Sequence, residues 1–348
     1  EALGWVYQYF GEEEREEIDD RVDRENYKIA GTDIATKTQL FTPRYIVEWM
    51  VDNSLGRTWL EMQGDRSSIA DEDNCFYLAP LEDSLTDRET KPVKDIRMLD
   101  PACGSGHMLL YAFDVLYQMY LEESEVPEKY IPREILRNNL YGIDIDSGAT
   151  QIAALSLYLK VKEKSPDVTI PQLNIVSADA VLINGDRKQD VLERTSSELE
   201  EEILEQVWRS FENIREVGSL VEVEDRIDDI LEDYRETFES KGQAQFTEEG
   251  GLTTQSTFVS EGQEETWVEL KERLMENVRE IAQTALEQDD PVEEMFASEV
   301  GKTVELLDVL RGDYDIVVSN PPYLGSGKMG DELKKFVKDN YLGSRDLY

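Results

Sequence analysis

The stretch IRMLDPACGSGHMLL, residues 96–110, decides which fold the sequence predicts. An apolar run ends at Asp100, a turn with two glycines follows, and a helical pattern then covers residues 107–123. Glycines let the backbone turn tightly and approach a ligand closely, while the N-terminus of the next helix offers free N–H groups. We therefore expect a strand, a ligand-binding turn at Gly104 and Gly106, and a helix. An ordinary strand–helix turn is the alternative, because the third glycine of the dinucleotide fingerprint is missing.

Three more short apolar runs have the character of buried strands. They are LYGIDID (140–146), LNIVSADA (173–180) and YDIVVSN (314–320), and a helical pattern follows the first of them. Apolar strands that alternate with helices are typical of a parallel sheet covered on both faces. The sequence therefore predicts an α/β fold with a parallel-sheet core.

A long acidic segment separates the third of these strands from the fourth. Residues 181–310 carry apolar side chains at helical spacing and more than half of the net negative charge. A crossover between strands needs far fewer residues than this. We therefore expect an inserted helical subdomain in this segment.

Helical patterns also precede the core. Residues 1–24 have an apolar face at helical spacing, and TPRYIVEWMVDNSLG (42–56) predicts a second helix. In that second helix, Thr42 is a candidate N-cap and Gly56 a candidate C-terminal stop. Residues 61–95 lack periodicity, so we expect a long irregular excursion there.

The composition indicates a globular protein with an unusual charge. The net charge is −41, with 77 acidic and 36 basic residues, which is typical of an acidic surface adapted to very high salt. Two cysteines argue against a disulfide framework. No secretory signal opens the chain, and its apolar runs are too short to span a bilayer, so we expect a cytoplasmic protein without a membrane partner. Because the chain begins at Glu1, we also expect it to be a piece of a longer protein.

Polar side chains end each of the predicted strands. Asp144 closes the second strand, where a carboxylate can accept hydrogen bonds from both hydroxyls of a ribose. Asp146 is a second candidate for that role, but its place before SGATQIAAL favours a helix N-cap. Asp179 closes the third strand and could accept a hydrogen bond from an adenine amino group or cap a loop. After the fourth strand, SNPPY (319–323) forms a stiff turn, because prolines cannot continue the ladder.

Taken in order, these motifs resemble those of the S-adenosylmethionine-dependent amino-methyltransferases of DNA, in the γ arrangement and of the N6-adenine type. QLFTPRYIVEWMVDNSLG (39–56) resembles the cofactor motif that precedes the glycine motif in that family. DPACGSGHMLL, YGIDID, SAD and NPPY are similar to the next four motifs, and GSRDLY resembles the motif after the catalytic one. The residues of the first two motifs resemble in particular those of the PglX methyltransferases of BREX phage-defence systems and of the type IIG restriction-modification enzymes.

The resemblance implies a Rossmann-like class I methyltransferase fold with an N-terminal helical region and a long acidic helical insertion. It also suggests domain boundaries. We expect a helical region with the first cofactor motif, the first part of the core, the insertion, and the second part of the core. These cover residues 1–60, 61–182, 183–312 and 313–348.

The resemblance also implies site residues. Thr42 and Pro43 would contact the methionine moiety of S-adenosylmethionine, Asp144 its ribose and Asp179 its adenine. The full expected cofactor set is Thr42, Pro43, Asp100, Pro101, Ala102, Gly104, Gly106, Asp144, Ile145, Asp179 and Ala180. The expected catalytic residues are Asn320, Pro321, Pro322 and Tyr323.

The chemistry of the catalytic motif follows from the weakness of the nucleophile. The lone pair of an exocyclic base amine is delocalised into the ring, and two acceptors that grip its hydrogens favour a pyramidal nitrogen. The side-chain carbonyl of Asn320 and the backbone carbonyl of Pro321 can serve as these two acceptors. Tyr323 can stack on a base that is flipped out of the duplex. Alignment and electrostatics then suffice for direct transfer, so no metal is expected.

Other acceptors and roles stay open at this point. Cytosine-N4 enzymes usually carry Ser or Asp in place of Asn320, and protein-glutamine methyltransferases share NPPY but lack the motif at 39–56 and the long insertion. A non-catalytic component of a defence complex, which binds cofactor and partner proteins, is a further alternative. Double-stranded DNA is the expected partner. Because the charge repels a polyanion, we expect the region that recognises DNA sequence to lie outside this chain.

Overall fold

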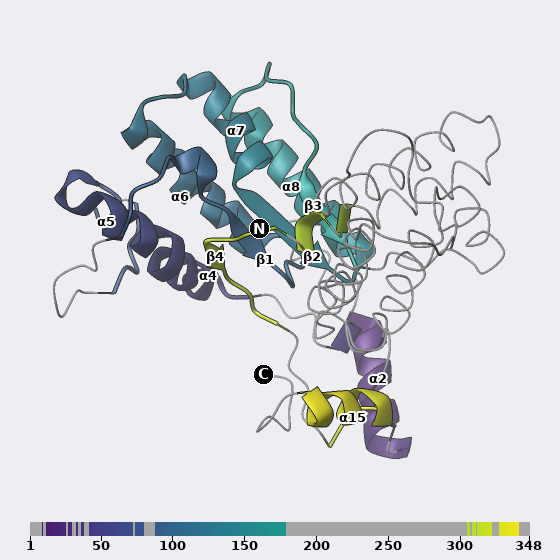
Figure 1. Cartoon of the computed structure of the whole chain (residues 1–348). Coiled ribbons are helices and arrows are strands. Elements are labelled where there is room, and N and C mark those ends of the chain that lie inside the picture. The colour runs from purple at the N-terminus through teal and green to yellow at the C-terminus, as the bar shows by residue number, and fades with distance from the viewer. Residues whose placement is uncertain are drawn as a thin grey trace, which may run out of the picture. The chain divides into compact units, whose positions relative to one another are not determined.

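The computed structural model describes part of the 348-residue chain (Figure 1). The described residues are 9, 12–25, 27–29, 33, 36–37, 42–71, 74–79, 88–178, 305–306, 308–310, 312–321 and 327–340. The chain divides into two compact units, and the first comprises residues 1–179, 215–219 and 311–348. The helices predicted within 181–310 fall almost wholly in the second unit and, apart from residues 305–306 and 308–310, lie outside the described residues.

The sheet confirms the predicted fold class. Its four strands are parallel and follow the order β3-β2-β1-β4. All four were expected from the apolar runs, and they are β1 (Met98–Asp100), β2 (Leu140–Asp144), β3 (Asn174–Ser177) and β4 (Ile316–Val317). The fold is therefore α/β with a Rossmann-like methyltransferase arrangement of parallel strands.

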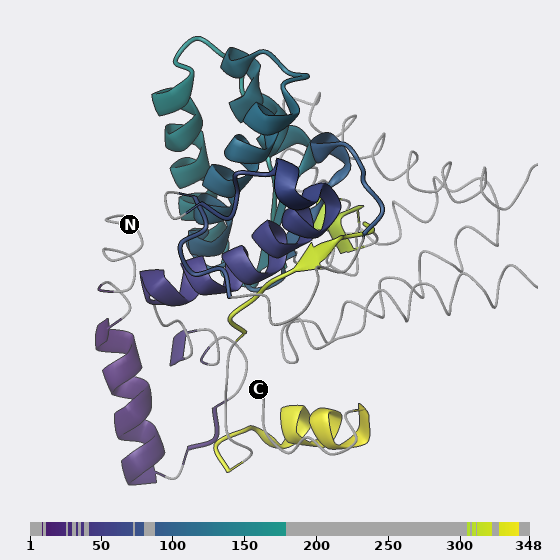
Figure 2. The same ribbon diagram turned by 90° about the vertical axis from the view of Figure 1, so that its left-hand side faces the viewer.

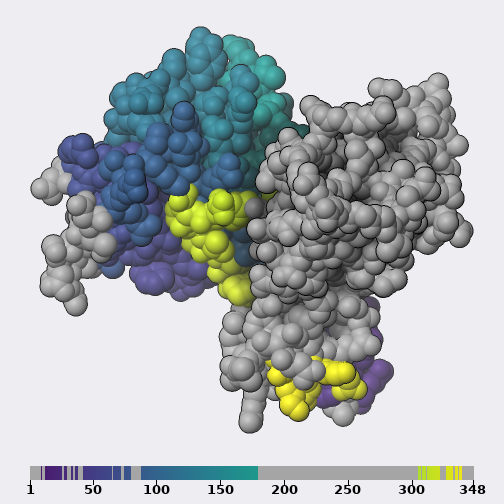
Figure 3. All heavy atoms as spheres, viewed as in Figure 1, coloured from purple at the N-terminus to yellow at the C-terminus, as the bar shows by residue number. Residues whose placement is uncertain are grey.

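Strand β4 joins the sheet from the far end of the sequence. Met98 lies opposite Ile316 and Leu99 opposite Val317 in the parallel register. At the start of the pair, the carboxylate of Asp315 accepts a hydrogen bond from the Arg97 amide at 2.9 Å. Figure 3 shows the yellow-green residues of β4 packed against blue residues that precede them by about two hundred positions.

Three helices pack on the sheet and on one another (Figures 1 and 2). They are α6 (His107–Glu123), which occupies exactly the predicted range, α7 (Ile131–Asn138) and α8 (Ser147–Lys164). Their apolar faces form the core, in which Phe113 and Tyr120 are fully buried. The sequence analysis did not single out α7, a short helix with Pro132 in its first turn. Single-turn 3-10 helices complete this part: η3 (Val93–Asp95) and η4 (Glu128–Tyr130).

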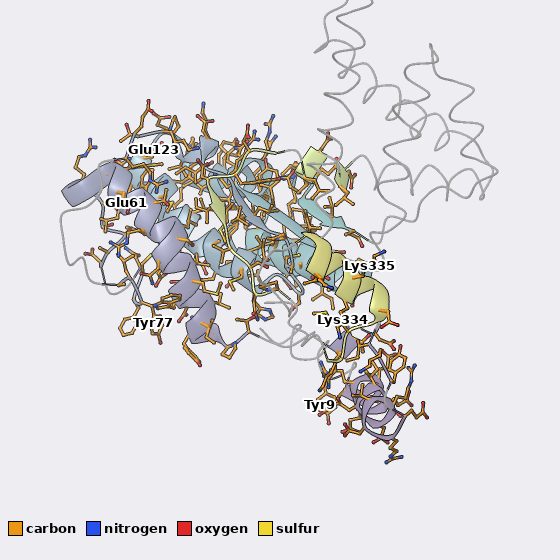
Figure 4. The ribbon with its side chains drawn as sticks, turned by 60° about the horizontal axis from the view of Figure 1, so that its bottom comes forward. Tyr9, Glu61, Tyr77, Glu123, Lys334 and Lys335 are labelled. Carbon is orange, nitrogen blue, oxygen red and sulfur yellow. The ribbon has the colours of Figure 1, made fainter. Side chains whose placement is uncertain are left out.

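The helix predicted over 42–56 is longer than expected. Helix α4 (Arg44–Val51) continues through a π-helical turn, η1 (Asp52–Gly56), into α5 (Arg57–Gln63), and Figure 4 shows one unbroken helix. The predicted stop at Gly56 is therefore wrong. A side chain at Gly56 would meet the Cys75 sulfur at 2.9 Å, so this glycine permits a close approach, and the helix ends instead at Gly64, whose φ is 58°. The prediction that residues 61–95 are irregular fails for the last turn of α5 and the short helices η2 (Gly64–Arg66) and η3.

The predicted N-cap of this helix is also wrong. The capping residue is Pro43, with φ −55° and ψ 139°, and no side chain caps the first turn. The Thr42 hydroxyl is engaged elsewhere, as described below.

Two further helices lie near the ends of the chain. Helix α2 (Glu12–Glu25) covers part of the helix predicted over 1–24, and residues 1–8 lie outside the described set. Helix α15 (Asp331–Asn340) follows a short parallel bridge between Ile29 and Met329. Within the described ranges, no helix is both long and apolar enough to cross a membrane.

Candidate cofactor and amine site

The strand order reverses between β1 and β4. From β1 the chain proceeds through β2 to β3 on one side, and β4 then pairs with β1 on the other. In open parallel sheets, ligands bind outside the carboxyl ends of the strands where the order reverses in this way. Asp100 ends β1 and Asn320 follows β4, so both sequence motifs meet at this position.

The glycine turn after β1 is fastened to the end of β2. The Gly104 amide donates to Asp144 Oδ2 at 2.7 Å, and the Cys103 amide donates to the Ile143 carbonyl at 2.8 Å. Gly104 and Gly106 have φ values of 52° and 85°, which residues other than glycine rarely adopt. The turn therefore depends on both glycines for its shape.

The two glycines face different surroundings. A Cβ atom at Gly106 would lie 2.9 Å from the Cβ of Ala153, so Gly106 lets the start of α6 pack closely on α8. A Cβ atom at Gly104 would meet no other atom within 4 Å. Open space above Gly104 is what close approach of a ligand to the turn requires.

Asp144 and Asp146 have different roles, as the sequence suggested. Asp146 caps α8, because its Oδ1 accepts hydrogen bonds from the amides of Gly148 at 2.8 Å and Ala149 at 3.2 Å. Asp144 instead accepts at both carboxylate oxygens, from the amides of Gly104 at 2.7 Å and Asp146 at 2.9 Å. Burial raises the pKa of the Asp144 carboxyl, while these N–H groups favour its ionised form and oppose the shift.

Asp100 is the most deeply buried acid of the site, with a side chain 1% exposed. The amide of Ala102 donates to its Oδ1 at 3.2 Å. Burial raises the pKa of Asp100 to about 7; the Ala102 amide opposes this rise, and the charge of Asp144 adds to it. Ser319 also lies near Asp100, which follows only from the pairing of β4 with β1, so the sequence did not single it out.

The NPPY motif and the motif at residues 39–56 meet through a hydrogen bond. Asn320 Nδ2 donates to Thr42 Oγ1 at 2.9 Å, across a sequence separation of 278 residues. Asn320 and Pro321 are exposed at the end of β4, whereas Thr42 is partly buried before α4. Pro322 and Tyr323, as well as Asp179 and Ala180, lie outside the described residues.

A buried network that the sequence did not reveal holds the helix that follows Thr42. Asp52, fully buried in the π-helical turn, accepts hydrogen bonds from the Tyr111 hydroxyl at 2.7 Å and the Tyr77 amide at 2.8 Å. Asn53 donates to the Tyr77 carbonyl and accepts from the Ala79 amide. Figure 4 shows Tyr77 beside this helix. Burial raises the pKa of Asp52, and the Tyr111 hydroxyl opposes that rise.

Comparison with known protein families agrees with this geometry. The sequence model described as Eco57I restriction-modification methylase matches residues 138–348, more than half of the chain. The chain belongs to this family. The model of the DNA-methyltransferase domain of MmeI matches residues 82–177, which contain the glycine turn and the first three strands.

Known relatives cover the whole chain. An adenine-specific methyltransferase PglX from Lacticaseibacillus casei is 31% identical over 361 aligned positions, and BrxX from Escherichia coli, also named an adenine-specific methyltransferase, is 29% identical over 364. Both alignments include 100% of this chain but only 26% and 27% of those relatives. A putative type II restriction enzyme and methyltransferase from Methanocaldococcus jannaschii is 36% identical over 34% of the chain and 10% of its own length. The chain thus spans about a quarter of the length of the first two relatives.

The structure therefore brings together most of the described site residues that the sequence suggested. Thr42 meets Asn320, Gly104 meets Asp144, and Asp100 lies under the same turn. Pro101 and Ala102 are partly buried within the turn, and Ile145 is partly buried just after β2. Asp146 is the exception, because its carboxylate is used as a helix cap.

Proposed function

We propose that the protein transfers a methyl group from S-adenosylmethionine to the N6 amine of adenine in DNA, as part of a restriction-modification or phage-defence system. The observation that carries the proposal is the position of Asn320. Its side chain contacts Thr42 of the first cofactor motif, at the sheet edge that also holds the Gly104–Asp144 turn. Family membership and the names of the relatives support adenine as the base.

The residues of this edge fit S-adenosylmethionine. Among the described residues, Asp144 Oδ2 accepts from the Gly104 amide and Oδ1 from the Asp146 amide, and a carboxylate oxygen can accept more than one hydrogen bond, so a ribose hydroxyl can also bind there. The open space above Gly104 admits a ligand to the turn. When bound, the cofactor supplies an activated methyl group on a sulfonium. Thr42, Pro43, Asp100, Pro101, Ala102, Gly106 and Ile145 would line the same site, with Asp179 and Ala180 next to the adenine.

The exposed end of β4 would hold the substrate. The carbonyl oxygens of Asn320 and Pro321 accept the two hydrogens of the target amine, and its lone pair then points toward the methyl group. Because the prolines restrict the backbone, both acceptors stay in place before the base arrives. Tyr323 would stack on the flipped base, which is worth roughly 1–3 kcal/mol, and Pro322 would keep that ring in position.

We further propose the organisation of the whole protein. Residues 1–60 would supply the first cofactor motif, 61–182 and 313–348 the two parts of the core, and 183–312 an acidic insertion that docks a partner protein of the defence system. The region that recognises the DNA sequence would lie outside these 348 residues, because the relatives are about four times as long. A chain with −41 net charge also offers little attraction for DNA on its own.

The test uses the complete natural protein, phage and host DNA, and S-adenosylmethionine with a tritiated methyl group. After hydrolysis of the DNA to nucleosides, we expect the label in N6-methyldeoxyadenosine, and we expect Asn320→Ala to lose it. Label in N4-methyldeoxycytidine or in protein would replace adenine as the substrate. Cofactor binding without any transfer by the wild-type protein would support a non-catalytic role instead.

A further inference from the structure

The amide of Asn320 can serve the reaction in only one of its two orientations. One end of the group, Oδ1, accepts hydrogen bonds, and the other end, Nδ2, only donates them. A target amine also presents hydrogens, so it needs Oδ1. If the amide were rotated by half a turn, its own N–H groups would face those of the amine, and the grip would be lost.

The structure holds the amide in the useful orientation. Nδ2 donates to Thr42 Oγ1 at 2.9 Å, which leaves Oδ1 on the other side of the group. Asn320 is exposed, and within the described residues no other side chain is recorded in a hydrogen bond with it. The Thr42 hydroxyl is thus the recorded partner that holds the amide in place, and in this structure it acts as the acceptor.

Thr42 is well placed to hold the Asn320 amide, because the residues after it are fixed. The Pro43 carbonyl accepts from the amides of Ile46 at 2.9 Å and Val47 at 3.2 Å, which anchors the start of α4. The same helix is tied to α6 through the hydrogen bond from Tyr111 to buried Asp52. On the other side, β4 is held to β1 by the hydrogen bond from the Val318 amide to the Leu99 carbonyl at 3.0 Å.

We propose that Thr42 is a positioning residue for methyl transfer: its hydroxyl accepts from Asn320 Nδ2 and thereby presents Oδ1 to the target amine. The proposal rests on the proposed function and extends it, since it gives a residue of the first cofactor motif a second task on the substrate side. Loss of the hydroxyl should then slow transfer even when the cofactor site is full.

The test compares two substitutions in the complete protein. Thr42→Val keeps the shape of the side chain and removes the hydroxyl, whereas Thr42→Ser keeps the hydroxyl. The transfer rate is measured in single turnovers at saturating S-adenosylmethionine, cofactor affinity by calorimetry, and folding by thermal melting. Thr42→Val should lower the rate roughly tenfold to a hundredfold, as misplaced groups do, and change cofactor affinity far less. Thr42→Ser should retain most of the wild-type transfer rate.

A double-mutant cycle assigns the effect to Asn320. In the Asn320→Ala background there is no amide to orient, so Thr42→Val should add little to the loss. Three results would overturn the proposal. Thr42→Val could leave the transfer rate unchanged, or its lower rate could be restored by more cofactor. It could also lower the rate as much in the Asn320→Ala background as in the wild type. A wild-type protein that binds cofactor but methylates no adenine would overturn the proposed function, and this proposal with it.

Discussion

The two halves of the site are built in different ways. At the ends of β1 and β2, Asp100 is buried and Asp144 partly buried, and both accept hydrogen bonds from backbone amides of the glycine turn. At the end of β4, Asn320 and Pro321 are exposed, and one side-chain hydrogen bond holds the amide. The proposed cofactor side is thus formed by the fold itself, whereas the proposed amine side is exposed and, among the described residues, is held by the bond to Thr42.

This difference predicts that substitutions on the two sides change different quantities. On the amine side, interactions matter mainly in the transition state, so the rate should fall while the protein folds and binds cofactor normally. On the cofactor side, the same groups shape the turn and fill the core, so binding and stability should change.

Asn320→Ala should have the largest effect. Removal of one preorganised polar group commonly lowers a rate by roughly a hundredfold to a thousandfold. Because Asn320 is exposed, its loss should leave the melting temperature and the affinity for S-adenosylmethionine unchanged. The rate is measured in single turnovers with the complete protein, and a variant as fast as the wild type would remove Asn320 from the amine grip.

Asp100→Asn should change how stability depends on pH. A carboxyl with an ordinary pKa near 3.9 in the unfolded chain and about 7 in the folded one favours folding when protonated. This contribution is complete below about pH 4 and is lost as the pH rises through 7. Each unit of difference corresponds to about 1.4 kcal/mol, so the loss is on the order of a few kcal/mol.

The measurement for Asp100 is denaturant unfolding at roughly pH 5 and pH 8 in matched salt. The wild-type free energy of unfolding should fall more over this interval than that of Asp100→Asn, which has no charge to bury. Parallel behaviour of the two proteins would show that Asp100 does not titrate in this range.

Asp144→Ala should weaken cofactor binding by roughly tenfold to a hundredfold, since hydrogen bonds to a charged group contribute about 1.5–3 kcal/mol. Calorimetry with S-adenosylmethionine measures it. The matched control is Asp146→Asn, which keeps an N-cap for α8 and should bind like the wild type. Equal affinity in Asp144→Ala and the wild type would remove the ribose assignment.

Asp146→Ala should cost only about 1 kcal/mol of stability, the usual contribution of an N-cap. Its carboxylate accepts hydrogen bonds from the amides of Gly148 and Ala149 at the start of α8. Chemical denaturation should show this loss, with cofactor affinity retained after correction for the folded fraction. A large loss of affinity in the folded protein would place Asp146, and not only Asp144, on the cofactor side.

The sequence was informative where a local pattern determines the structure. Apolar runs and the glycine turn predicted the strands and α6, and the position of Asp146 before a helical pattern favoured its role as a cap. Such features depend on neighbours within a few residues, which periodicity and turn chemistry record.

Other features depend on contacts between distant segments. The helix passes through Gly56 in a π-helical turn, and Cys75 of the following loop lies so close that a Cβ atom at Gly56 would be 2.9 Å from its sulfur. The bonds of Asp52 to Tyr111 and of Thr42 to Asn320 join residues 59 and 278 positions apart. No local pattern contains this information, so the capping role expected for Thr42 gave way to a tertiary contact.

The most direct test of the account is a crystal structure of the complete protein with S-adenosylhomocysteine, the product left after methyl transfer. We predict that the ribose lies against Asp144, that the ligand passes over Gly104, and that its sulfur faces Asn320. A ligand bound elsewhere, or one at this edge with its sulfur turned away from the end of β4, would contradict the claim that the two halves form one methyl-transfer site.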